Sequence, residues 1–215
     1  MFLGIDIGTS GVKTLLIDEQ QNIVASAHSE LGVSRPHPGW SEQHPEDWIA
    51  ATSETLDVLK ASHPKALAAL QGIGLSGQMH GATLIDKQDQ VLRPCMLWND
   101  TRSHAEATGL DANSLFRNLS GNIVFPGFTA PKVKWVQAHE PDLFAEVHKV
   151  LLPKDYVRLW LSGEYVSDLS DAAGTSWLDV GKRDWSQDLL AASGMSLEQM
   201  PALVEGTEVS GQLRE

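Results

Sequence analysis

A short segment near the N-terminus, residues 6–13 (DIGTSGVK), gathers a carboxylate, two hydroxyls, an ammonium group and two glycines in one turn. Glycines allow a tight turn whose backbone N–H groups approach a ligand closely. A carboxylate at the end of a buried strand is costly to bury unless it meets a cation. These residue types together predict a turn that holds a metal-bound polyphosphate. The expected metal ligand is Asp6, and the expected phosphate contacts are Gly8, Thr9, Ser10 and Lys13.

The same segment also fits a plainer structure, a hairpin with turn glycines and a capping aspartate. It is not the phosphate loop with the G-x4-G-K-[ST] pattern, because that spacing is absent. The complete string D-x-G-T-S-x-x-K lies at the end of the first predicted strand. This position favours phosphate binding over the plain hairpin.

Two later segments place polar side chains directly after apolar strands, namely residues 76–81 (SGQMHG) and 97–102 (LWNDTR). In open α/β sheets, ligands gather at the carboxyl ends of strands. Amide, imidazole and carboxylate groups can bond the hydroxyls of a sugar or polyol, and Met and Trp can pack on its carbon skeleton. The candidate substrate-binding residues are Gln78, Met79, His80, Trp98, Asn99 and Asp100.

Each of these segments has a structural alternative. A lone histidine such as His80 is more often a structural residue than a ligand. Trp98 could lie in the core, with Asn99 or Asp100 as a helix cap. Residues 128–136 fit an amphipathic helix with its Trp and Val in the core. Residues 167–175 either line a pocket or begin a helix, and the pattern leaves both open.

Composition narrows the class of protein. The chain has 215 residues and a formal net charge of −12, which argues against non-specific binding to nucleic acid or anionic membrane. A single cysteine cannot form an internal disulfide and favours a reducing, cytoplasmic setting. No stretch has the roughly 18 apolar residues of a membrane helix. The histidines are too scattered to indicate a histidine-ligated metal site, and the absence of a G-x-S-x-G elbow gives a hydrolase little support.

The order of the predicted elements is that of an α/β protein. Three strands on short turns predict an antiparallel meander, and a helix follows that begins at a proline with acidic residues in its first turn. Further strands then alternate with helices, as in the actin-like, ribonuclease-H-like ATPase fold. The predicted strands are 2–7, 12–18, 23–28, 71–76, 82–85 and 95–98. The predicted helices are 45–62, 101–110, 130–138 and 154–161.

Several of these motifs together resemble the FGGY family of carbohydrate kinases. The opening D-x-G-T-S-x-x-K string, the Gly77–Gly81 segment, the Leu97–Asp100 segment and the Gly127–Trp135 segment occur in the family's order. The resemblance covers essentially all of residues 1–215, which correspond to the N-terminal of the two actin-like domains expected in the family. The resemblance implies that ATP, Mg²⁺ and an open-chain ketose or polyol meet in a cleft between those domains.

The resemblance also implies roles for single residues. Asp6 helps to hold Mg²⁺, Thr9, Ser10 and Lys13 lie near the phosphates, and the sugar is contacted by the residues of the two later segments. The Gln-Met-His-Gly form is similar to that of family members that phosphorylate D-xylulose to D-xylulose 5-phosphate with ATP. Glycerol-specific members carry Arg-Glu where this chain has Met79 and His80, which argues against glycerol. A homodimer of the full-length protein is compatible with the family.

Family members are about twice as long as this chain. The resemblance places the second phosphate loop, the adenosine site and the general-base aspartate outside residues 1–215, so we expect the chain to end inside a longer protein and to be inactive alone. Three alternatives stay open: an inactive fragment or sugar-binding module, a kinase for another pentulose or polyol, and an actin-like ATPase indifferent to sugars.

Overall fold

The computed structural model describes residues 1–214, and its largest sheet has the strand order β3-β2-β1-β5. Strands β1 (Phe2–Ile7), β2 (Gly11–Ile17) and β3 (Ile23–Glu30) are antiparallel, as the sequence predicts. Strand β5 (Gly72–Gly77) pairs with β1 in parallel. Side chains alternate between the faces of a strand. Leu3, Ile5 and Ile7 therefore lie buried on one face, and Asp6 lies on the other.

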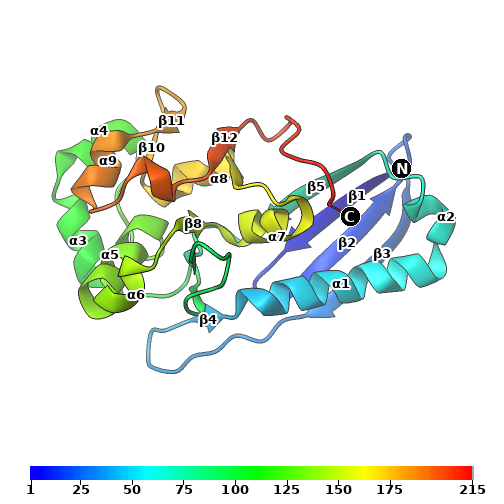
Figure 1. Ribbon diagram of the computed structural model, residues 1–215, viewed down its shortest axis with the longest axis horizontal. Helices are drawn as coiled ribbons and strands as arrows, with labels where there is room; N and C mark the ends of the chain where they lie inside the picture. The colour runs from blue at the N-terminus through cyan, green and yellow to red at the C-terminus, as the bar shows by residue number, and fades with distance from the viewer. Residues whose placement is uncertain (215) are drawn as a thin grey trace.

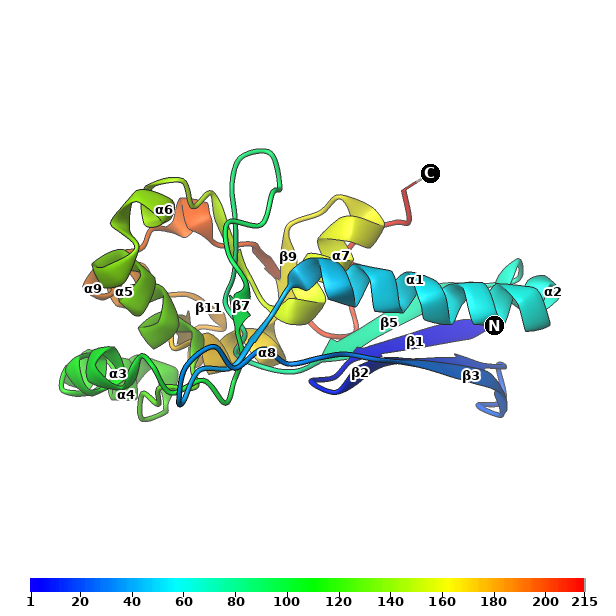
Figure 2. The same ribbon diagram turned by 90° about the horizontal axis from the view of Figure 1, so that it is seen from below.

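Two helices, α1 (Pro45–Ser62) and α7 (Pro153–Ser162), cover the buried face of this sheet (Figure 2). Helix α1 has the predicted bounds, with a proline in its first turn and with Glu46 and Asp47 at the positive end of its dipole. Its Trp48 is fully buried. The short helix α2 (Pro64–Leu67) leads from α1 into β5. We call the sheet with α1, α2 and α7 the sheet region.

The remaining elements form a second body at the other end of the molecule, which we call the helical region (Figure 1). Its strands pair two by two. They are β4 (Glu42–Gln43) with β7 (Cys95–Met96), β6 (Thr83–Ile85) with β8 (Lys149–Leu151), β9 (Val166–Asp168) with β12 (Ala202–Val204), and β10 (Leu178–Asp179) with β11 (Asp184–Trp185). Its α-helices are α3 (His104–Asp111), α4 (Ser114–Ser120), α5 (Thr129–His139), α6 (Pro141–Ala145), α8 (Leu169–Ala172) and α9 (Gln187–Ala192), and 3-10 turns span Ala173–Thr175 and Leu197–Gln199.

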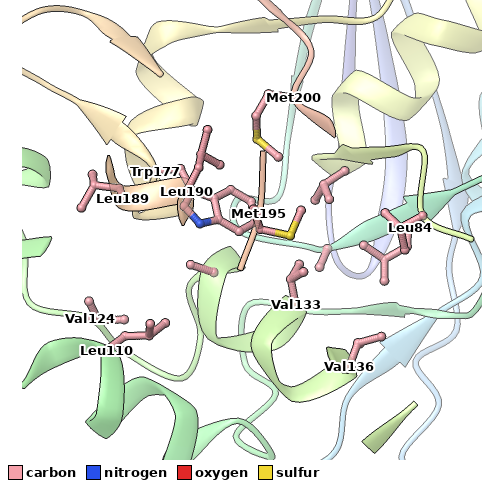
Figure 3. Close-up of a cluster of buried hydrophobic side chains, with 14 of the residues drawn as sticks. Leu84, Leu110, Val124, Val133, Val136, Trp177, Leu189, Leu190, Met195 and Met200 are labelled. Carbon is pink, nitrogen blue, oxygen red and sulfur yellow. The ribbon is translucent and has the colours of Figure 1, made fainter. Parts of the chain in front are cut away.

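Each region has its own hydrophobic core. The core of the sheet region joins the buried face of the sheet to α1 and α7. In the helical region, Val133 and Val136 of α5 face Leu110 of α3, Leu190 of α9 and the buried ring of Trp177 (Figure 3). The two cores meet: Cys95 of β7 belongs to the core of the sheet region, and a small third cluster joins Ile85 and Leu151 of the helical region to Leu159 of α7.

The structure changes some predicted bounds. The helix expected from residue 101 begins at His104, and the strand expected to reach residue 98 ends at Met96. Trp135, expected in the core beside Val136, is only half-buried. None of the helices within residues 1–214 is both long and apolar enough to cross a membrane.

Candidate functional site

The predicted phosphate turn joins β1 to β2. The Gly8 N–H donates to the Gly11 carbonyl at 3.0 Å and closes the turn. A Cβ at Gly8 would lie 3.1 Å from that same oxygen, which is tighter than ordinary packing. Thr9 and Ser10 occupy the tip of the turn, where Ser10 is exposed. The turn thus presents hydroxyls and backbone N–H groups at one end of the sheet.

The Asp6 side chain is exposed, and the expected cost of burying its carboxylate does not arise. The strand itself is buried on one face only, and Asp6 points to the other. It lies opposite Lys13 of β2 and Ser76 of β5, and the Ser76 hydroxyl donates to Asp6 Oδ1 at 2.7 Å. A single accessible carboxylate suits Mg²⁺, which binds through one or two carboxylates, phosphate oxygens and water. Within residues 1–214, no group of three His, Cys, Asp or Glu side chains forms a metal cluster.

The fold brings the three predicted segments together at one point. The Thr9 hydroxyl donates to Gln78 Oε1 at 2.9 Å and accepts from Trp98 Nε1 at 3.0 Å. The backbone N–H of Gln78 also donates to the carbonyl of Ile7. Residues up to 89 positions apart in the chain therefore share one hydrogen-bonded junction. Because Gln78 is buried and bonded to Thr9, it links the loops.

Gln43 of β4 completes this junction, and sequence reasoning missed it. Its amide nitrogen donates to the carbonyls of Thr9 and Gly32 at 2.8 and 2.9 Å. Its amide oxygen accepts from Gln78 Nε2 at 2.8 Å and from Trp48 Nε1 at 3.0 Å. A buried amide with all these partners fixes the geometry around it. No local motif marks this glutamine, because every partner except Trp48 is distant in sequence.

His80 lies in the left-handed backbone region with φ of 66°, which is uncommon for residues other than glycine. Its ring lies 4.6 Å from the Phe128 ring. On another side is Gly174, where a Cβ would lie 2.3 Å from the imidazole Cε1. Burial, with the charge of Lys132, lowers the pKa of His80 to about 4. The neutral imidazole has a buried Nδ1 without a partner in the described residues.

The apolar members of the predicted site are accessible. Met79 and Trp98 are 47% and 45% exposed, so both can pack on a ligand. Phe125 lies edge-on to Phe128 and is similarly exposed. The Asn99 Oδ1 atom is buried and bonds to no other described residue. The candidate residues therefore offer exposed apolar surface at Met79 and Trp98 and unbonded polar atoms at His80 and Asn99.

Asp100, a candidate substrate-binding residue, lies inside the protein. It is fully buried. Its Oδ2 accepts from the Ser41 N–H at 2.7 Å and from Arg102 Nη2 at 2.6 Å, and its Oδ1 accepts from the Arg102 N–H at 3.0 Å. Arg102 also pairs with Glu42 at 2.7 Å and lies over the Trp40 ring. Both oxygens are therefore used inside the protein. In this structure Asp100 supports the loop that carries Trp98.

A cleft of about 990 Å³ is lined by β5, by residues of α7 and by residues 204–213. Ser76, Gly77 and Met79, which flank Gln78 of the junction, also line it. The sequence left open whether residues 167–175 line a pocket or begin a helix, and both are true. Asp168, Ser170 and Asp171 line this cleft, and the Asp168 side chain caps the start of α8. Lys154 pairs there with Asp168 at 2.9 Å and with Asp171 at 2.7 Å.

Known proteins with the same sequence pattern carry the same fold. Residues 1–215 match the N-terminal domain of the FGGY family of carbohydrate kinases. Xylulose kinases from Escherichia coli strain K12 and Klebsiella pneumoniae are 55% and 56% identical to 99% and 100% of this chain. A crystal structure of a xyloylose kinase from Brucella ovis superposes with a TM-score of 0.98 at 66% identity, covering 99% of this chain and 45% of that one.

These matches confirm the predicted α/β fold, the actin-like N-terminal domain of that family. A xylulose kinase from Rhodospirillum rubrum that is only 28% identical still superposes with a TM-score of 0.94. The chain spans 44% of the length of each of the two curated relatives.

Proposed function

The chain belongs to the FGGY family of carbohydrate kinases, and from this premise we propose that it contributes the sugar-contacting loops and one phosphate turn to a kinase for D-xylulose. The product would be D-xylulose 5-phosphate. The observation that carries the proposal is the junction at Thr9, where one hydroxyl joins the phosphate turn to Gln78 and Trp98. Phosphoryl transfer depends on holding the acceptor and the phosphates in register. A direct bond between the two loops supports that task.

The proposed roles follow from exposure and bonding. Met79 and Trp98 pack on the carbon skeleton of the sugar, and His80 and Asn99 bond its hydroxyls. Gln78 holds the sugar loop against the phosphate turn, and Asp100 holds the Trp98 loop through Arg102. Neutral imidazole and amide groups can both donate to and accept from the hydroxyls of a ketose. The sugar identity itself rests on the xylulose kinases to which the chain is 55–56% identical.

The exposed polar groups of the phosphate turn suit the second substrate, magnesium-bound ATP, which supplies the phosphoryl group. Asp6 would take part in holding the metal, and Thr9, Ser10 and Lys13 would contact the phosphates with the Gly8 backbone. The general base is not among the proposed residues of this chain, so we propose that complete transfer also needs groups outside residues 1–215. A cytoplasmic setting belongs to the same proposal, because the lone Cys95 is a buried free thiol.

The test is a pair of measurements on this chain. Calorimetric titration with D-xylulose should give binding that His80→Ala weakens, and glycerol should not bind. ADP release in the presence of ATP and Mg²⁺ should stay at background with and without D-xylulose. Robust, sugar-stimulated ADP release would contradict the shared-site part of the proposal. Binding of glycerol but not D-xylulose would contradict the substrate.

A further inference from the structure

Lys132 of α5 is a buried cation in the helical region. It has no exposed surface. Its ammonium donates to the carbonyl of His80 at 2.9 Å and to the carbonyl of Gly127 at 2.5 Å. Both partners are backbone carbonyls, so within the described residues neither hydrogen bond goes to a carboxylate. A buried lysine with this arrangement calls for a physical reason.

The position is electrostatically expensive. Lys132 lies at the N-terminal end of α5, where the helix dipole disfavours a cation. Burial lowers the pKa of Lys132 to about 7, with Asp100 opposing that shift and Arg102 adding to it. The neighbouring Cys95 thiol is itself neutral at this pH, because burial raises its pKa to about 11. An apolar side chain would fill the same space without this cost.

The positions of the His80 and Gly127 carbonyls indicate the structural role of the Lys132 ammonium. His80 has φ of 66°, and such strained backbone persists only where its surroundings fix it. Lys132 and the Thr129 hydroxyl, at 3.2 Å, hold the His80 carbonyl from α5. Gly127 packs against the backbone of Trp98, because a Cβ there would lie 2.4 Å from the Trp98 carbonyl oxygen. Through these contacts one ammonium holds the loops of His80 and Trp98 together.

We propose that Lys132 is a positioning residue for the sugar site, fixing the backbone of His80 against Gly127 so that the imidazole faces the ligand between Phe128 and Gly174. The proposal rests on the proposed function for the identity of the ligand. The positioning itself is a property of the free protein. It can therefore be measured without any sugar.

The experiment follows the His80 ring by NMR of the histidine-labelled chain, with the resonance assigned by its loss in His80→Gln. The variant Lys132→Met keeps an unbranched side chain one atom shorter than that of lysine and removes the charge and the donors. Lys134→Met is the matched control, because Lys134 lies on the same helix and, among residues 1–214, its ammonium bonds only Gln137. A pH series from about 5.5 to about 8.5 lies above the titration of His80 itself.

In the wild type we expect the His80 signal to move with an inflection about pH 7, as Lys132 titrates beside it. Lys132→Met should shift the signal and abolish that inflection, and Lys134→Met should preserve both. Affinity for D-xylulose should fall about tenfold or more in Lys132→Met and stay unchanged in Lys134→Met. A lysine that only fills space would leave the affinity for D-xylulose unchanged in Lys132→Met as well as in Lys134→Met.

A folded Lys132→Met protein with wild-type His80 signals and wild-type affinity would overturn the proposal. If Lys132→Met does not fold, Thr129→Val carries the test, since it removes only the weaker bond to the same carbonyl. A smaller shift of the His80 signal supports the proposal, and an unchanged signal overturns it. If the wild type binds no D-xylulose, the proposed function fails, and the His80 signals still decide the positioning role.

Discussion

The sheet region and the helical region contribute to the candidate site in opposite ways. The charged groups that the β1–β2 hairpin of the sheet region brings to the candidate site, Asp6 and Lys13, are exposed. In the helical region the charged groups are buried and act at long range, as Lys132 does on His80 and Asp100 on Ser41. Exposed charges stay available to a charged ligand at little cost in stability. Buried charges instead fix loops, and their loss is expensive.

The largest expected effect tests that contrast directly. Asp100→Ala leaves Arg102 buried with Glu42 as its remaining partner, and we expect the free energy of unfolding to fall by about 3 kcal/mol. Asp6→Ala, the matched loss of a carboxylate in the sheet region, should change it by less than about 0.5 kcal/mol. Urea denaturation measures both. Equal losses would show that the two regions do not differ in this way.

A smaller effect is expected from crowding His80. In Gly174→Ala the new Cβ would lie 2.3 Å from the imidazole, whose backbone cannot yield easily. We expect a loss of about 1–3 kcal/mol in stability and weaker binding of D-xylulose. Gly206→Ala is the control, because nothing lies within 4 Å of a Cβ there. Thermal unfolding and calorimetric titration measure the two effects, and similar behaviour of both variants would sink this prediction.

The pH dependence of stability should report the buried imidazole. Burial lowers the pKa of His80 to about 4 from its usual 6.5. Between these values the unfolded chain binds a proton that the folded chain does not, so stability rises as pH increases from about 4 to about 6.5. Comparing denaturation curves of wild type and His80→Gln isolates this contribution. If the free energy of unfolding changed with pH to the same extent in both proteins, His80 would not titrate as its burial implies.

The smallest effect on stability is expected at the phosphate turn. Asp6→Asn keeps the acceptor for the Ser76 hydroxyl and removes an exposed charge. The free energy of unfolding should therefore change by less than about 0.5 kcal/mol. Binding of Mg²⁺-ATP should weaken nevertheless, which calorimetry can measure. Ser10→Ala, which removes an exposed hydroxyl from the same turn, serves as a milder comparison. Unchanged nucleotide affinity in Asp6→Asn would remove the metal role from Asp6.

Sequence alone settled the features that depend on neighbouring residues. The alternation of strands β1 to β3 predicted the meander, and the proline and acidic residues at Pro45 predicted where α1 begins. Short motifs marked the three segments that meet at Thr9, and their order identified the family that residues 1–215 match. These features can be predicted because hydrophobic periodicity, turn-forming residues and helix caps each depend on only a few neighbouring residues.

Tertiary structure decided the direction and burial of side chains. Only the fold shows that Asp6 is exposed, that Asp100 is enclosed by Arg102, and that Gln43 and Lys132 support the ligand loops. Their partners lie 35 residues away for Gln43 and Gln78 and 52 residues away for Lys132 and His80. A side chain's hydrogen bonds depend on which elements pack against it, and no local pattern in the chain encodes that packing.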